Sequence, residues 1–256
     1  IPKQQSFVSL DIVKIKADLI AKIHHIYTRR RTLMAQYALR KGRNIAGTAR
    51  PRSSDEPPAI IARPKKQKIV KIVAIGTSTG GPPALQRVLT ALPKNFPVGI
   101  VVVQHMPATF TKSLADRLDT LSQIHVKEAE DGEKIEAGTA YIARGDRHLL
   151  VKKSLTSTVC TLSETPTDTL HRPSVDVMMS AVAESFGGLS LGVIMTGMGQ
   201  DGLVGLRAMK QKGADVIAQD EQTCVVYGMP RAVVEAGIAD AIAPLDQIPS
   251  EIMAYF

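Results

Sequence analysis

The sequence predicts an α/β fold: a doubly wound, mostly parallel sheet with helices on both faces. From residue 69 onward, short β-branched runs alternate with helical stretches, and the strand runs lack the apolar–polar alternation of half-exposed strands. Continuous apolar runs are typical of strands that are buried on both faces. The strand–helix–strand repetition favours parallel strands joined by right-handed crossovers.

Five strands are expected in this sheet, and five helices are expected to cover it. The strands are residues 69–75 (IVKIVAI), 99–104 (GIVVVQ) and 189–195 (LSLGVIM), with weaker runs at 215–218 and 240–243. The helices are residues 83–92, 111–121, 174–186, 202–212 and 230–236. Between residues 124 and 162, Gly and Asp turn signals separate short β runs at 140–143 and 148–151. Turns between short strands indicate hairpins, so a small antiparallel excursion is expected there.

Charge divides the chain into two parts. The net formal charge is +12 over residues 1–68 and −4 over residues 69–256. The first part combines a helical apolar spacing at 11–27 with a Pro-rich basic stretch at 47–68, which is typical of a linker. We therefore expect a linker helix and a basic flexible linker over 1–68, and one α/β domain over 69–256.

The basic clusters at 29–31 and 40–43 would suit nucleic acid or an anionic membrane surface. Aromatic residues are few in this segment, and no known nucleic-acid motif accompanies the charge. A solvated linker is the favoured interpretation, and no specific nucleic-acid partner is expected.

Composition excludes several classes of protein. Hydrophobic residues make up 44% of the chain, which is too many for a disordered protein. Cys160 and Cys224 form no Cys-x-x-Cys pair, which excludes a disulfide framework and a Cys-rich zinc module. No apolar run reaches the ~18 residues of a transmembrane helix, so no membrane insertion is expected. The chain starts at Ile1 without a secretory signal, and we expect a fragment of a cytoplasmic protein.

Ser78 lies in a Gly-rich turn, GTSTGG at 76–81, between the first strand and a helix. Residues 76–80 match Gly-x-Ser-x-Gly, a sharp bend that exposes a serine oxygen. The helix N-terminus would supply amides for a developing oxyanion. The alternative is an anion-binding turn without catalysis, although the nucleotide-binding spacing and the Walker lysine are missing.

His105 and Asp201 complete a candidate catalytic set. Of the six histidines, only His105 directly follows a predicted core strand, where a neutral imidazole can accept a serine proton. The alternative is a structural histidine that bonds a backbone carbonyl. Asp201, in the turn at 196–202, can orient His105 through its second ring nitrogen, or it can cap the helix that follows. The backbone amide of Met198 is the first candidate oxyanion donor and that of Thr79 the second.

These turns are expected to meet because ligands in open α/β folds bind at the carboxyl edge of the sheet. The order Ser78, His105, Asp201 differs from the Ser, acid, His order of standard α/β hydrolases, so that fold is disfavoured. No histidine pair has the spacing of a metal site, and we predict neither a metal ion nor another cofactor.

Five motifs together resemble the catalytic domain of chemotaxis protein-glutamate methylesterases, the CheB family, over about residues 69–248. They are IGTSTGG at 75–81, QHMP at 104–107, HRPSVD at 171–176, MTGMGQDG at 195–202 and VYGMP at 226–230. The resemblance implies a catalytic triad of Ser78, His105 and Asp201. It also places His171, Arg172 and Pro173 at the rim of the site. The alternative for those three residues is a helix start at Pro173.

The same resemblance implies a serine hydrolase of chemotaxis adaptation. It would demethylate glutamyl 5-O-methyl esters on methyl-accepting chemotaxis receptors, releasing methanol, and also deamidate receptor glutamines. The family carries an N-terminal receiver domain that is phosphorylated by a chemotaxis histidine kinase. Such a domain needs ~120 residues in a flavodoxin-like fold, which residues 1–68 cannot hold. We therefore expect the receiver to be absent from this chain. The alternative function is a non-catalytic anion-binding or protein-interaction domain.

Overall fold

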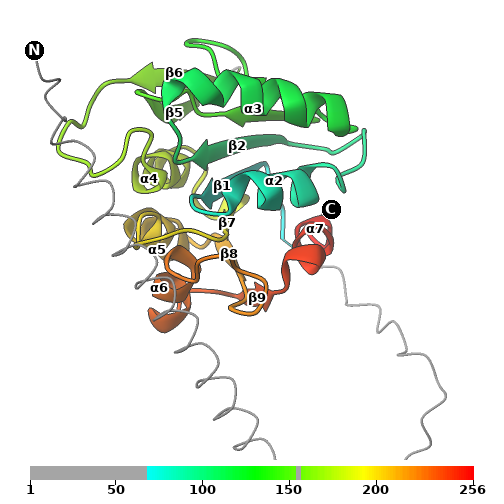
Figure 1. Cartoon of the computed structure of the whole chain (residues 1–256), viewed down its shortest axis with the longest axis vertical. Coiled ribbons are helices and arrows are strands. Elements are labelled where there is room, and N and C mark those ends of the chain that lie inside the picture. Colours follow the sequence, from blue (N-terminus) through cyan, green and yellow to red (C-terminus); the bar gives the residue numbers. More distant parts are fainter. Residues whose placement is uncertain (1–67, 154–156) are drawn as a thin grey trace, which may run out of the picture. The chain divides into compact units, whose positions relative to one another are not determined.

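The structure is a computed structural model of the chain, and it describes residues 68–153 and 157–256. The expected linker helix and the two basic clusters lie outside the described residues, as does all of the basic linker except Lys68. The boundary between linker and domain therefore stays a prediction. The α/β fold class is confirmed, and Figure 1 shows its elements.

Seven parallel strands form the main sheet, in the order β3-β4-β2-β1-β7-β8-β9 (Figure 1). Their bounds are β1 Ile72–Thr77, β2 Gly99–Gln104, β3 His125–Glu128, β4 Thr139–Ile142, β7 Ser190–Ile194, β8 Asp215–Gln219 and β9 Ala241–Ala243. The three central strands, β2, β1 and β7, are buried along their whole length. Burial on both faces explains why these segments read as continuous apolar runs.

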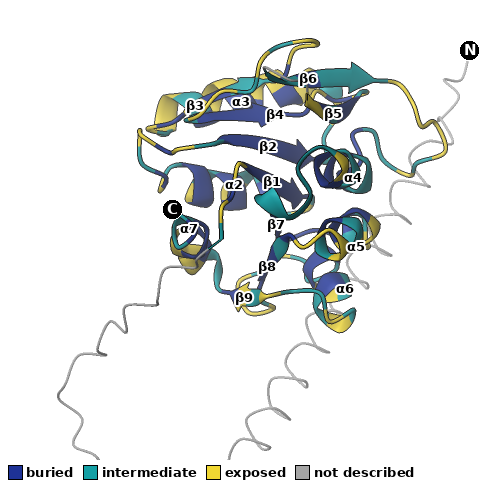
Figure 2. Ribbon diagram, turned by 180° about the vertical axis from the view of Figure 1, so that it is seen from behind, coloured by how far each residue is buried: buried dark blue, intermediate teal, exposed yellow. Residues whose placement is uncertain are grey.

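Three helices cover each face of the sheet. They are α2 Gly81–Leu89, α3 Ala108–Leu121 and α7 Ile248–Met253 on one face, and α4 Val175–Phe186, α5 Leu203–Gln211 and α6 Met229–Glu235 on the other. Alternate residues of β1 enter the two cores, since Ile75 packs with the first set and Ile72 with the second. Figure 2 shows the buried strands between helices whose outer sides are exposed.

The predicted antiparallel excursion is confirmed for one pair of strands and wrong for the run at 140–143. β5 His148–Lys153 and β6 Thr158–Ser163 do form an antiparallel hairpin. The run at 140–143, however, falls in β4, which pairs in parallel with β2, and the unexpected β3 pairs in parallel with β4. The local turn signals were misleading because partners distant in sequence, such as Ile100 beside Ala140, decide the pairing of this strand.

Element ends differ from the predictions by at most three residues, those of β2 not at all, and two segments besides β3 were missed. α3 begins at Ala108 rather than at residue 111, directly after the N-cap Pro107. The short helix α7 and the strand β6 were not predicted.

Pairing register brings three strand ends to one edge of the sheet. Thr77 pairs with Gln104, and Gly76 pairs with Ile194, so β1, β2 and β7 end at the same level. The chain then leaves each strand into one of the turns singled out from the sequence. The expected meeting of these turns at the carboxyl edge is therefore observed.

Candidate active site

Ser78 is the first residue after β1, in a turn that only glycine can complete. Its N–H donates to the Thr196 carbonyl at 3.0 Å, which joins the ends of β1 and β7. Gly80, the N-cap of α2, has a φ of +81°, and a Cβ there would lie 2.6 Å from the Cβ of Val225. The positive φ and the close neighbour both require glycine, and the resulting bend leaves Ser78 half-buried.

Gln104 ties the serine turn to the histidine turn. Its Nε2 donates to the Ser78 carbonyl at 3.0 Å and to the His105 carbonyl at 2.9 Å. The side chain is buried at the end of an otherwise apolar strand. Sequence reasoning gave Gln104 no role, although a polar residue that closes a run of β-branched residues is a usable signal.

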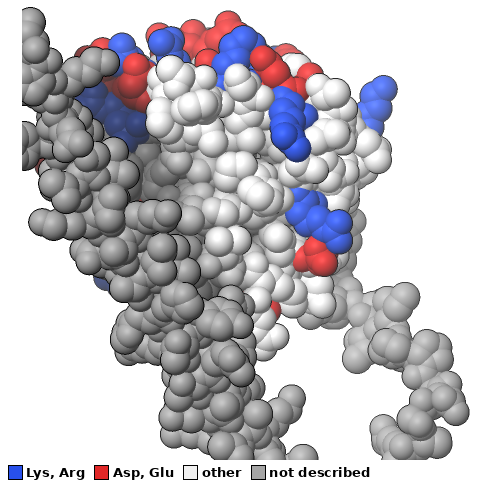
Figure 3. Space-filling view, viewed as in Figure 1, with Lys and Arg blue, Asp and Glu red and all other residues white. Residues whose placement is uncertain are grey.

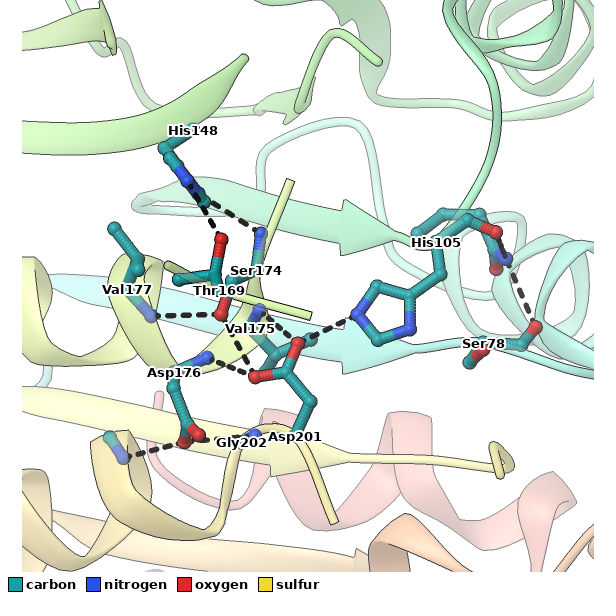
Figure 4. A network of polar contacts seen from close by, with 12 residues as sticks. Ser78, His105, His148, Thr169, Ser174, Val175, Asp176, Val177, Asp201 and Gly202 are labelled. Atoms are coloured by element: carbon teal, nitrogen blue, oxygen red, sulfur yellow. Dashed lines mark hydrogen bonds and ion pairs between the residues drawn. The ribbon is translucent and has the colours of Figure 1, made fainter. Parts of the chain in front are cut away.

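His105 and Asp201 form a nearly buried pair. His105 Nε2 lies 2.7 Å from Asp201 Oδ2, and the two side chains are 8% and 14% exposed. The other ring nitrogen, Nδ1, is buried and has no hydrogen-bond partner among the described residues. It lies on the side of the ring that faces Ser78 (Figure 4). The structure thus brings together the three residues singled out from the sequence.

The Asp201 carboxylate also caps a helix, but a different one from the helix expected. The N-cap of α5 is Gly202, without a side-chain cap. Asp201 instead accepts from the start of α4: from Val175 N at 2.7 Å, Asp176 N at 3.0 Å and Ser174 Oγ at 2.9 Å. Contact across 25 to 27 residues decides this capping, and no local pattern predicts it.

These donors set the charge of the carboxylate. Burial alone would raise the pKa of Asp201, but the hydrogen bond from His105 and the two backbone N–H groups outweigh burial and hold the pKa well below its usual range. Asp201 is therefore ionised at neutral pH. The ionised Asp201 carboxylate beside His105 Nε2 favours the tautomer with the ring proton on Nε2. His105 Nδ1 is then free to accept a proton.

Asp176, in α4, binds the start of α5. It lies in the first turn of α4, and its Oδ1 accepts from Gly202 N at 2.9 Å and Gly205 N at 2.8 Å, at the start of α5. N–H groups at the start of each helix thus donate to an aspartate near the start of the other: Asp176 in the first turn of α4, and Asp201 in the turn directly before α5. Burial, and then the nearby charge of Asp201, raise the pKa of Asp176 against the effect of the Gly205 N–H.

We expect Asp176→Asn to be at least as stable as the wild type at pH 7, because the asparagine oxygen still accepts from both glycines while the buried charge is gone. Asp176→Ala should lose about 2 kcal/mol, since both N–H groups lose their acceptor. Native Asp176 holds its proton more tightly than the unfolded chain, whose pKa is near 3.8. Its contribution to stability therefore falls as the pH rises above that value.

Urea denaturation at pH 4 and pH 7 measures both effects. The stability advantage of Asp176→Asn over the wild type should grow between the two pH values. An Asp176→Asn protein as unstable as Asp176→Ala at pH 7 would contradict this account.

His171 packs directly on His105. The two rings are stacked, with centroids 4.0 Å apart and planes at 27°. Burial, and then the charge of His105, lower the pKa of His171, so His171 is disfavoured as a second cation. Arg172 accepts from Asp146 N through its carbonyl at 3.2 Å. The alternative of a helix start at Pro173 is wrong, because α4 begins at Val175 with Ser174 as its N-cap.

A family model described as CheB methylesterase matches residues 73–252. The chain belongs to the CheB methylesterase family.

Relatives within the CheB family are similar along nearly the whole chain. The protein-glutamate methylesterase/protein-glutamine glutaminase 1 of Oleidesulfovibrio alaskensis is 46% identical, over 99% of this chain and 71% of the relative. The protein of Nitratidesulfovibrio vulgaris with the same name, numbered 2, is also 46% identical over the same shares. The crystal structure of the Thermotoga maritima CheB methylesterase catalytic domain superposes with a TM-score of 0.71 at 48% identity. It covers 73% of this chain and 99% of that domain.

The two candidate oxyanion donors of this CheB-family domain lie beside Ser78. A Cβ on Gly197 would lie 2.9 Å from the Ser78 Cβ, so the turn that carries Met198 lies against the serine. Neither the Met198 N–H nor the Thr79 N–H donates to another residue in the described ranges. Both amides are thus available to a ligand, and their role stays a prediction.

Other features of the described residues bear on the remaining expectations. In residues 68–153 and 157–256, no three His, Cys, Asp or Glu side chains are grouped to hold a metal ion. No helix in these ranges is long and apolar enough to cross a membrane. On the face shown in Figure 3, basic side chains gather over α3 next to acidic ones rather than in a patch of one sign.

Proposed function

We propose that this chain is a protein-glutamate methylesterase with protein-glutamine glutaminase activity, in which Ser78 is the nucleophile, His105 the general base and Asp201 the orienting acid. One observation carries the proposal. The buried His105 ring has Asp201 at one nitrogen and an unpartnered nitrogen on the side of Ser78. The names of the family's relatives agree with this chemistry.

The geometry supports a two-step hydrolysis. Ser78 Oγ attacks the ester carbonyl while His105 Nδ1 takes the hydroxyl proton, and Asp201 stabilises the resulting imidazolium. His105 then protonates the methoxy oxygen, so that methanol leaves and a glutamyl ester of Ser78 remains. Water, deprotonated by His105, attacks this ester and releases the glutamate and Ser78. A glutamine side chain follows the same course with ammonia as the leaving group.

We further propose that two backbone amides stabilise the charge that develops on the carbonyl oxygen. The N–H groups of Met198 and Thr79 flank Ser78 from two different turns, and neither is used within the described part of the fold. Two preorganised donors of this kind typically contribute several kcal/mol to lowering the barrier, with about 3–4 kcal/mol for one donor.

The surroundings of Ser78 favour a protein substrate. Three apolar residues at or near the site are strongly exposed. Leu170, directly before His171, is 91% exposed, Met198 is 72% exposed, and Val225, which lies against Gly80 of the serine turn, is 69% exposed. Exposed apolar residues around a site indicate contact with another protein. We therefore propose methyl-accepting chemotaxis receptors as substrates, in the cytoplasm, with control by a receiver domain of the same protein and its histidine kinase.

The two activities are separated by their products. We expect the chain to release methanol from receptor membranes with methylated glutamates, and ammonia from the same receptors with glutamine at those positions. Both yields should vanish in Asp201→Asn because one set of residues performs both reactions. Release of methanol without ammonia would remove the glutaminase activity from the proposal. Release of no product at all would favour a non-catalytic domain.

A further inference from the structure

His148 is a fully buried histidine outside the proposed triad. It opens β5, and its ring is inaccessible to solvent. Three groups of the segment before α4 surround the ring: the Pro166 carbonyl at 2.9 Å from Nε2, the Thr169 hydroxyl at 3.3 Å from Nε2 and the Ser174 N–H at 3.2 Å from Nδ1. Figure 4 shows His148 above Ser174, on the far side of Asp201 from Ser78.

These contacts fix the state of the ring. A backbone N–H can only donate, so Nδ1 of His148 must accept from Ser174 and carries no proton. The single ring proton is then on Nε2, where it is donated to the Pro166 carbonyl. Burial lowers the pKa of His148, which agrees with a neutral ring.

Ser174 links His148 to Asp201 through hydrogen bonds. Its hydroxyl accepts from Val177 N at 3.4 Å and donates its one proton to Asp201 Oδ1 at 2.9 Å. Ser174 is 3% exposed, so water does not compete for these bonds. The backbone of Ser174, in turn, is held by His148.

We propose that His148 is a positioning residue for the hydrolysis, acting through Ser174 on Asp201 and thereby on the His105 ring. This inference rests on the proposed function. Asp201 Oδ2 is shared between His105 Nε2 and Val175 N, both at 2.7 Å, so a displacement of the segment that starts at Ser174 also displaces the partner of His105. A shift of 1 Å at a reacting group can cost about 100-fold in rate.

Two substitutions of His148 test the hydrogen bonds of its two ring nitrogens separately. In His148→Asn the side-chain oxygen can occupy the place of Nδ1 and still accept from Ser174. In His148→Gln the longer amide can reach the Pro166 carbonyl but does not place an acceptor at the Nδ1 position. We expect kcat of His148→Asn to stay within about 3-fold of wild type and that of His148→Gln to fall about 10- to 100-fold, with KM unchanged in both.

Methanol release, corrected for the folded fraction measured by circular dichroism, provides these constants. Equal kcat values for the two variants would overturn the inference, and so would a loss explained by the unfolded fraction. If neither variant folds, Ser174→Ala tests the same link. It should lower kcat at constant KM, and a wild-type kcat in this variant would overturn the inference.

A second measurement needs no substrate. The proton between His105 Nε2 and Asp201 should give a low-field NMR resonance that is absent in His105→Ala. We expect it in wild type and His148→Asn, and shifted or lost in His148→Gln. A wild-type enzyme without Ser78-dependent activity would refute the proposed function, whereas an unchanged resonance in His148→Gln would refute the role of His148 alone.

Discussion

Ser78→Ala should abolish methanol release, lowering kcat at least about 1,000-fold, because it removes the proposed nucleophile. The fold should be unaffected. The Ser78 hydroxyl makes no hydrogen bond with another described residue, and its backbone bonds to Thr196 and Gln104 do not involve the side chain. The free energy of unfolding should therefore change by less than about 0.5 kcal/mol.

Methanol release from methylated receptor membranes measures the first effect and urea denaturation the second. Ser250→Ala is the control, because it removes an exposed serine hydroxyl on α7, which packs on the opposite face of the sheet from α4 and α5. It should keep wild-type activity. A Ser78→Ala protein that retained near-wild-type turnover would rule out Ser78 as the nucleophile.

Asp201→Asn should lower turnover about 10,000-fold, as in other triads in which the acid is replaced by its amide. The structure adds an expected loss of stability. Four donors converge on the carboxylate, two at each oxygen, and an amide nitrogen can accept from neither member of a pair. Whichever way the asparagine is turned, two donors lose their acceptor, at a cost of about 1–3 kcal/mol each if they stay unpaired.

Asp176→Asn is the control for this change, since it alters a second, half-buried aspartate of the same helix pair whose carboxylate does not contact His105. It should keep most of the activity. Kinetics and denaturation of both variants decide the outcome. If Asp201→Asn loses stability but keeps its turnover per folded molecule, Asp201 is only a cap for α4.

The acid side of the stability profile gives an independent check on Asp201. Its native pKa lies below the unfolded value of 3.8, so its contribution to stability is present above that pH and is lost as the pH falls below it. The wild type should therefore lose more stability than Asp201→Asn between pH 5 and pH 3. Parallel curves would show that the native carboxylate is not stabilised by its donors.

The sequence predicted the central sheet well because its strands are buried on both faces. The bounds of β2 match the predicted run, in which apolar residues continue without interruption from Ile100 to Val103. The parallel pairing of β3 and β4 was missed because strands this short take their partners from contacts distant in sequence, such as that of β4 with β2.

The candidate site was predictable only in part, for a similar reason. Ser78, His105 and Asp201 could be found because each lies in a turn that follows a predicted strand. The hydrogen bonds of Asp201 to Ser174 and Asp176, and the contact of His148 with Ser174, join segments 25 to 27 residues apart. No periodicity links such positions, so these supporting residues required the structure.

The exchange of caps between α4 and α5 has a consequence for protein engineering. Asp201 directly precedes the N-cap of α5 and accepts hydrogen bonds at the start of α4, so a designer cannot relocate the acid without rebuilding both helix starts. Leu170, Met198 and Val225, by contrast, are mostly exposed. Libraries that randomise these three positions should therefore yield variants with new ester preferences on an undamaged scaffold.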